Sequence, residues 1–296
     1  MVTHTQSIEN PNFSSSYVLK RTFSQIFDTI KFEIVRNFRK LLLIMALFFG
    51  VFAIFFIYYF NTYPDPTNLL PLLPNEYIRG YLDLAIQIMI LVLAVVFGAS
   101  TVVEDFEKQT GNLMFPNSTK IRLLAGRTIA AFILGSICII LYYLLIGLDT
   151  FRNYNTLPVE FYYSFFWAEL YFLMLLSFTI FFSSFSRSSA LVIILVVLLI
   201  LIVFTIVMRL IAFAGYEGEP LFILPYFASI ITEILTYPVS RKLTLRLDIR
   251  RSEGAAGRTF TNWLTPDPTT ALIFMLGYTI VFLGLSYFLF ERRQVQ

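Results

Sequence analysis

The side chains that most often carry enzyme chemistry are nearly missing from this sequence. Its 296 residues include one histidine, His4, and one cysteine, Cys138. A metal cluster of His and Cys ligands, or a nucleophile activated by histidine, therefore cannot be assembled. The motifs GxxxxGK(S/T), GxSxG and HExxH, which serve nucleotide binding, serine nucleophiles and zinc binding, do not occur either. The sequence predicts no catalytic residue, no metal and no cofactor, and a protein that is not an enzyme.

Two charged residues lie inside long apolar runs, where a charge is costly unless it is paired or wet. Glu169 is about eight residues into the run 161–182, and Arg209 is about five residues from the end of the run 190–214. At 1.5 Å per residue they would lie roughly 12 and 8 Å below the same boundary of the bilayer. We expect a structural ion pair between neighbouring helices. The alternative is a polar patch lining a substrate route, to which Gln87 and Asp83 would add.

The other candidate is the charged loop 104–127, which reads EDFEKQTGNLMFPNSTKIRLLAGR. It opens on three acidic residues, Glu104, Asp105 and Glu107. Gly111 permits a turn, Pro116 starts a new direction, and the following Asn-Ser-Thr can cap a helix. This pattern predicts a short helix with an acidic side that docks in a groove of a partner protein. An ordinary solvated loop is the alternative interpretation.

The composition indicates the elements that must hold these residues. The chain is 57% hydrophobic and 14% charged, which is typical of a protein that crosses a membrane several times rather than of a soluble domain. The net charge of +3 is too small to indicate nucleic acid as a partner. Six apolar runs are long enough to cross a bilayer as helices: 41–60, 84–103, 128–148, 161–182, 190–214 and 271–290. We predict an all-α polytopic membrane protein with six transmembrane helices.

The N-terminal region precedes these spans. Residues 1–16 are polar and are expected to be flexible. In 17–40, apolar residues recur at helical spacing opposite a basic face, which predicts an amphipathic helix lying in the membrane surface. A helix packed on a soluble domain is the alternative, but the chain offers no such domain.

Basic residues predict the orientation. They gather in every second segment: the N-terminal 17–40, the 104–127 loop, the 183–189 turn and the 291–296 tail. The alternate short connections hold only Arg79 and Arg152. By the positive-inside rule, both termini and the 104–127 loop are cytoplasmic. The connection 215–270 would then be external although it holds six basic residues, because long segments are translocated with less regard to charge.

That external connection has structure of its own. Residues 221–237 are apolar but short, and prolines flank them, so a re-entrant or surface helix is predicted rather than a seventh span. Residues 242–250 alternate polar and apolar side chains, which indicates a strand. Glycines in 252–257 can turn the chain back over 258–263, so we expect a small β element here.

The 104–127 loop resembles the corresponding loop in membrane permease subunits of type-2 ABC exporters. Matching positions are Glu104, Glu107, Thr110, Gly111, Leu113, Pro116, Lys120, Gly126 and Arg127. The order Thr-Gly inverts the commoner Gly-Thr, and Asn112 and Phe115 replace the usual acidic and small residues. A second similarity is the stretch 181–193, around Ser183, Ser184, Arg187 and Ala190.

The resemblance implies a permease dimer, homo- or heterodimeric, that works with two copies of a separate cytoplasmic ABC ATPase. The ATPase contact would be made by Glu104, Asp105, Glu107, Thr110, Gly111, Leu113, Pro116 and Lys120, with Arg187 as a secondary contact. The predicted protein is thus a multi-pass subunit of the cell membrane that exports a substrate when its partner hydrolyses ATP. A membrane scaffold or assembly subunit without transport is the alternative, and the sequence does not indicate the substrate.

Overall fold

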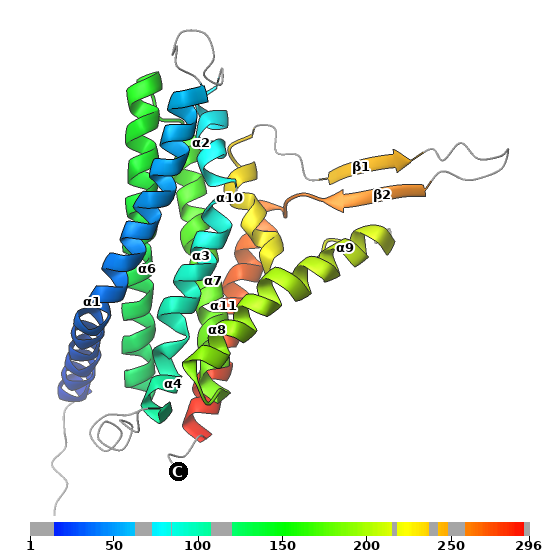
Figure 1. The fold of residues 1–296 in the computed structure, drawn as a ribbon. Helices are drawn as coiled ribbons and strands as arrows, with labels where there is room; N and C mark the ends of the chain where they lie inside the picture. Colours follow the sequence, from blue (N-terminus) through cyan, green and yellow to red (C-terminus); the bar gives the residue numbers. More distant parts are fainter. Residues whose placement is uncertain are drawn as a thin grey trace, which may run out of the picture.

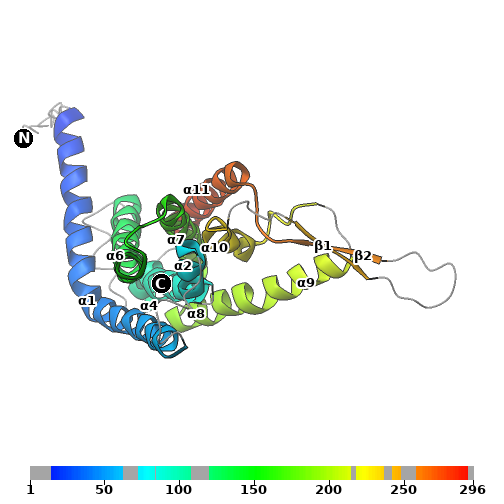
Figure 2. The same ribbon diagram turned by 90° about the horizontal axis from the view of Figure 1, so that it is seen from above.

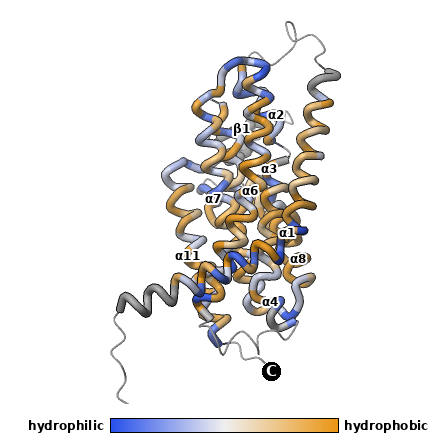
Figure 3. Tube along the Cα trace, turned by 90° about the vertical axis from the view of Figure 1, so that its left-hand side faces the viewer, coloured by the Kyte–Doolittle hydropathy of each residue, from blue (hydrophilic) through white to orange (hydrophobic). Residues whose placement is uncertain are grey.

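The computed structural model describes residues 15–62, 73–83, 85–107, 120–214, 218–236, 242–247 and 258–292. Helices dominate this part of the chain (Figure 1). Six of them are long and apolar enough to cross a membrane: Phe23–Tyr58, Ile86–Glu104, Ile121–Tyr154, Val159–Phe185, Ser189–Ala214 and Pro268–Arg292. Each contains or closely overlaps one of the six predicted spans. Hydrophobic segments run along the helices of the bundle in Figure 3.

The first span and the predicted surface helix form one continuous helix, α1 (Ser15–Thr62). No glycine or proline occurs between residue 15 and Gly50, so nothing in the sequence interrupts it. Figures 2 and 3 show that α1 changes direction, its first part crossing one end of the bundle and its second part rising along the bundle. In the first part, Phe23 and Phe27 are each 68% exposed. Their apolar face is available to lipid, as an interfacial helix requires.

The second span is broken into two helices. It follows the short α2 (Pro74–Leu82) and consists of α3 (Ala85–Gly98) and α4 (Ser100–Glu107), with a turn at Ala99. The Ser183 hydroxyl donates a hydrogen bond to the Ala99 carbonyl and accepts from the backbone amides of Val102 and Val103. A side chain thereby satisfies backbone groups near the break, which a membrane interior demands.

The centre of the bundle is formed by α6 (Lys120–Tyr154) and α7 (Val159–Phe185). The ring of Phe172 lies over Gly135, where any Cβ atom would overlap it. The same ring stacks on Phe132 with 5.8 Å between centroids. Glycine at 135 therefore allows the close approach of these two helices. The last helix, α11 (Pro268–Arg292), packs along α7, as the Ser184–Ser286 hydrogen bond shows.

The fifth span leaves the bundle. It runs through α8 (Ser189–Leu198), the π-helical segment η1 (Leu199–Val203) and α9 (Phe204–Ala214). Val192, Val196 and Ile200 are buried, whereas no residue of α9 is. Figures 1 and 2 show α9 diverging from the other helices.

The connection before α11 differs from expectation in one respect. In place of one re-entrant or surface helix over 221–237, there is a 3-10 turn, η2 (Leu224–Ala228), and a single α-helical turn, α10 (Ser229–Glu233). The prediction of such a helix is not supported. Pro225 excludes a helix that starts at Leu221 and runs through this position, and Phe227, Ile230 and Ile231 are buried in the core. In the segment where alternation indicated a strand, β1 (Lys242–Leu247) pairs antiparallel with β2 (Arg258–Trp263), Lys242 facing Trp263.

Candidate functional site

The described residues at the base of the charged loop lie at the end of α4 and the start of α6, which we call the loop end of the bundle. Residues 108–119, with Thr110, Gly111, Leu113 and Pro116, lie outside the described residues. The side chains of Asp105 and Lys120 also lie outside them. What the structure describes is how the loop is anchored on both sides.

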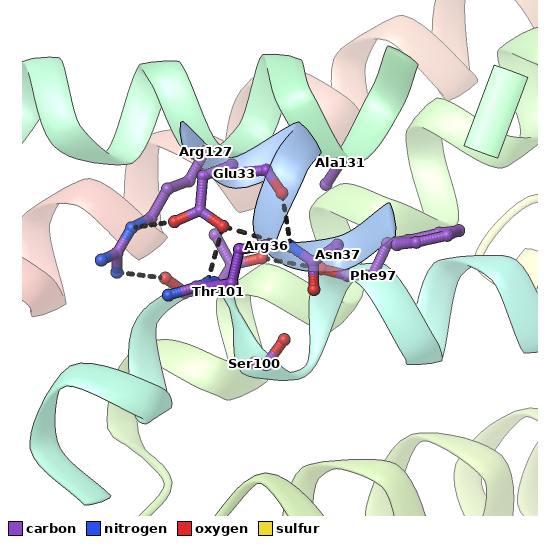
Figure 4. A pocket seen from close by; sticks show the side chains of 8 residues that line it. All are labelled: Glu33, Arg36, Asn37, Phe97, Ser100, Thr101, Arg127 and Ala131. Atoms are coloured by element: carbon purple, nitrogen blue, oxygen red, sulfur yellow. Dashed lines mark hydrogen bonds and ion pairs between the residues drawn. The ribbon is translucent and has the colours of Figure 1, made fainter. Parts of the chain in front are cut away.

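A buried network of charges joins α1, α4 and α6 at this end (Figure 4). The Glu33 carboxylate is 3.0 Å from the Arg127 Nε and 2.6 Å from an Arg36 Nη. The Glu33 and Arg127 side chains are only 4% and 3% exposed. Arg36 also lies 3.1 Å from Glu104, the first residue of the predicted loop. Two carboxylates and two guanidinium groups thus balance one another, with the Glu33–Arg127 pair nearly excluded from water and Arg36 partly exposed.

Hydrogen bonds complete this network. Asn37 donates to the Glu33 carboxylate and to the Glu33 carbonyl, at 3.2 and 3.1 Å. Arg127 donates to the carbonyl of Thr101, at 2.8 Å, close to the α3–α4 break. The cavity among these groups measures about 10 Å³, space for one water molecule at most. Neighbouring helices are therefore held here by specific polar contacts and not by apolar packing alone.

The same end brings together the two segments that the sequence pointed to separately. Glu107, the last residue of α4, accepts hydrogen bonds from the hydroxyl and the backbone amide of Ser189, at 2.9 and 3.3 Å. Ser189 begins α8 and is the last residue of the predicted 183–189 turn. Arg187 is exposed in that turn. Glu107 and Arg187 thus lie on neighbouring parts of one surface, whereas Glu104 faces α1.

The start of α6 packs closely on α1. A Cβ atom at Gly126 would lie 2.8 Å from Cβ of Thr29 and 3.2 Å from the Ile26 carbonyl oxygen, so only glycine fits without a shift. Arg122, which lies one turn before Gly126 in α6, donates a hydrogen bond of 2.8 Å to Gln25 of α1. The loop end is therefore attached directly to the part of α1 that crosses the bundle.

The structure does not bring Glu169 and Arg209 together. Glu169 accepts a hydrogen bond from Ser136 of α6, at 2.7 Å, and is half-buried. Arg209 is exposed on α9, which has left the bundle. Among the described residues, no ion pair joins the two side chains. Gln87 lines a cavity together with Arg209, while Asp83 is exposed at the end of α2.

The opposite end of the bundle holds a polar cluster that sequence reasoning missed. The hydroxyls of Tyr77 and Tyr81, on α2, donate to one oxygen of Asp149, on α6, at 2.5 and 2.7 Å. Asp149 is 7% exposed. Asn153 donates to the Tyr77 hydroxyl, at 3.1 Å. The sequence feature that could have indicated this cluster is a pair of tyrosines four residues apart, which share a helix face, together with a carboxylate at the end of an apolar run.

Arg79 of α2 forms a second link at that end. Its Nη2 lies 2.6 Å from Glu233 of α10. The Ser164 hydroxyl of α7 donates to the Ile231 carbonyl, at 2.7 Å. These bonds attach the short helices α2 and α10 to the long helices of the bundle. Polar contacts therefore join the helices at both ends of the bundle.

Comparison with known proteins identifies the family. The family model described as ABC-2 family transporter protein matches residues 5–295, nearly the whole chain. No curated protein matches the chain significantly. The matched region includes all six candidate spans and the anchored loop. This chain therefore belongs to the ABC-2 family of transporter proteins and is a multi-pass membrane permease of that type.

Proposed function

We propose that this protein is the permease subunit of an ATP-driven exporter, coupled to a separate cytoplasmic ATPase through the 104–127 loop. Membership in the ABC-2 family supports the transport role. The coupling role is supported above all by one observation, the contact of Glu107 with Ser189. It joins the root of the loop to the 183–189 turn, so a partner that binds this surface acts on the second, third and fifth spans together.

We assign the candidate residues to two groups, and the described contacts bear on Glu104 and Glu107 among them. Glu104 faces inward, against Arg36, and acts as an anchor of the loop. Asp105, Glu107, Thr110, Gly111, Leu113, Pro116, Lys120 and Arg187 are proposed as the ATPase contact. Because the buried network links α4 and α6 to α1, a displacement of the loop is transmitted to three helices as one body. We infer that ATP hydrolysis shifts the equilibrium between two arrangements of the spans in this way.

The remaining features of the proposal follow the family. Two permeases, identical or different, would work with two ATPase subunits, and the substrate would pass between the permeases. Both termini, the loop and the 183–189 turn would be cytoplasmic, and residues 215–270 external. The intramembrane Glu169 would serve a structural or pathway role with Ser136.

Charge reversal at Asp105 and Glu107 together is expected to weaken ATPase binding at least tenfold. Like charges opposed across an interface cost several kcal/mol, and about 1.4 kcal/mol corresponds to tenfold. The measurement is copurification of an ATPase with a phosphate-binding loop from membranes in mild detergent. Glu104 is left unchanged, because a lysine there would oppose Arg36.

The matched control is Asp28→Lys, which reverses an exposed charge on α1 near the same end. It should retain the ATPase. Normal ATPase binding and transport in the double variant would contradict the proposed contact. If the wild-type protein copurifies with an enzyme complex and no ATPase, the scaffold function is favoured instead.

Cysteine labelling tests the orientation. Cys138 is the only cysteine and is fully buried, so an introduced cysteine reports alone. Thr156 and Arg187 are exposed in turns at opposite ends of the bundle. In intact cells, a membrane-impermeant maleimide is expected to label Thr156→Cys at once and Arg187→Cys only after permeabilisation. The reverse pattern would place the loop end outside and remove the ATPase contact.

A further inference from the structure

A cavity of about 400 Å³ lies where α9 diverges from the bundle. Its walls come from α3, α9, η2, α10 and the end of β2. Figure 1 shows α9, α10 and β2 on the right-hand side of the bundle. The volume falls within the usual range for small-molecule sites, about 300–1,000 Å³. All of the residues that line it belong to the described part of the chain.

The floor of the cavity is apolar and aromatic. Ile223, Tyr226 and Trp263 are buried and form a small hydrophobic cluster separate from the main core. Phe204 and Met208 of α9 pack against this cluster and also line the cavity. Such a surface suits an acyl chain or a flat apolar group.

The rim of the cavity is polar and carries one cation. Arg209 lines it, together with Gln87, Thr205 and Ser229. Within the described ranges, no carboxylate lies within ion-pair distance of Arg209. Glu233, on the neighbouring α10, is paired with Arg79. The rim thus offers a guanidinium group and three uncharged polar side chains to a ligand.

Arg209 lies inside the candidate span Ser189–Ala214, where an anion is the matching group. Ala214 ends α9 five residues later, so Arg209 lies about 8 Å along the helix from that end. A cation within a span requires an anion or water, and guanidinium groups bind phosphate and carboxylate with paired hydrogen bonds. Reaching out to water is the simpler alternative. It does not account for the polar rim and the aromatic floor that share one cavity with Arg209.

We propose that this cavity binds an anionic amphiphile of the phospholipid class, its phosphate on Arg209 and its apolar part against Tyr226 and Trp263. Gln87, Thr205 and Ser229 supply further hydrogen bonds to the head group. The proposal concerns binding, and it holds whether or not the protein transports what it binds.

The tryptophans provide a direct probe of the site. The chain has two, Trp167 and Trp263, and only Trp263 lines the cavity. In the Trp167→Phe protein, fluorescence therefore reports on Trp263 alone. Phosphatidylglycerol with brominated acyl chains is added to the purified protein in mild detergent, and the same brominated chains on phosphatidylcholine serve as the zwitterionic reference. We expect phosphatidylglycerol to quench Trp263 at a concentration about tenfold lower, which corresponds to about 1.4 kcal/mol.

Two variants test separately the charge of Arg209 and the volume of the cavity, and a third serves as a control. Arg209→Gln, made in the Trp167→Phe background, is expected to reduce the tenfold preference to about twofold or less, since the paired hydrogen bonds to phosphate are lost. Arg152→Gln removes an exposed cation outside the cavity and should keep the preference. Ala212→Phe retains Arg209 but fills the cavity, so it should weaken quenching by both lipids.

Four results would overturn the proposal. These are equal quenching by both lipids in the Trp167→Phe protein, an unchanged preference in Arg209→Gln, unchanged quenching in Ala212→Phe, and competition by millimolar inorganic phosphate. The last would show a site for a free anion instead of an amphiphile. The comparison of the two lipids needs no change in the cavity, so it decides even if Arg209→Gln or Ala212→Phe fails to fold.

Discussion

Replacing Arg127 with methionine is expected to destabilise the protein by about 3 kcal/mol, because the buried carboxylate of Glu33 would lose one of its two cations. Arg36 would remain, but it also serves Glu104, so the network would keep an excess negative charge away from water. The carbonyl of Thr101 would lose the hydrogen bond from Arg127 as well. The measurement is the free energy of unfolding of the purified protein in detergent, followed by denaturant titration.

Two further variants identify the cause. Arg122→Met removes a half-buried arginine whose hydrogen bond among the described residues is to Gln25, and it should cost less than about 1 kcal/mol. Adding Glu33→Gln to Arg127→Met should restore part of the lost stability, because the excess charge disappears. Equal losses for Arg127→Met and Arg122→Met would show that the buried ion pair does not control the stability of the loop end.

The six spans could be predicted from the sequence because the bilayer demands long apolar runs, which need no knowledge of neighbours. Their ends could not be predicted so well. The third run covers 128–148, whereas α6 extends over Lys120–Tyr154. Apolarity marks only the membrane core, while Arg122 at one end and Asp149 at the other are held by other helices. The break at Ala99 likewise depends on Ser183, more than 80 residues away.

The sequence could indicate which residue types form the candidate site, but not which residues they contact in the fold. The acidic start of the loop stands out in the sequence, but the pairing of Glu104 with Arg36 depends on where α1 crosses the bundle. Glu169 and Arg209 have matching depths, yet η1 lies between α8 and α9, and α9 then diverges from the bundle. The hydrophobic pattern of the run Leu199–Val203 does not indicate a π-helical segment. The position of a residue along a predicted span therefore indicates which residues it could pair with. The direction in which each helix runs determines which of these pairs form.

Replacing Asp149 with leucine is expected to cost about 3 kcal/mol at the opposite end of the bundle. The hydroxyls of Tyr77 and Tyr81 would lose the carboxylate that accepts from both. Hydrogen bonds to a charged group contribute roughly 1.5–3 kcal/mol each, and the apolar leucine recovers a part of that sum. Asp149→Asn keeps an acceptor oxygen and should cost about half as much. Asp83→Leu, at an exposed position after α2, is the matched control and should stay within about 0.5 kcal/mol.

The pH dependence of this loss tests whether both tyrosine hydroxyls stay protonated donors in the folded protein. Burial, reinforced by the hydrogen bonds to Asp149, raises the pKa of Tyr77 and of Tyr81 well above the ordinary value of 10.0. A group whose pKa is raised on folding stabilises the folded state fully below its unfolded pKa, and the contribution is lost only as the pH passes the folded pKa. Both hydroxyls thus remain donors at pH 7 and at pH 9, and the cost of Asp149→Leu should be the same at the two values. A cost that falls between pH 7 and pH 9 would show that the tyrosines ionise there, in which case the carboxylate cannot be what holds α2 on α6.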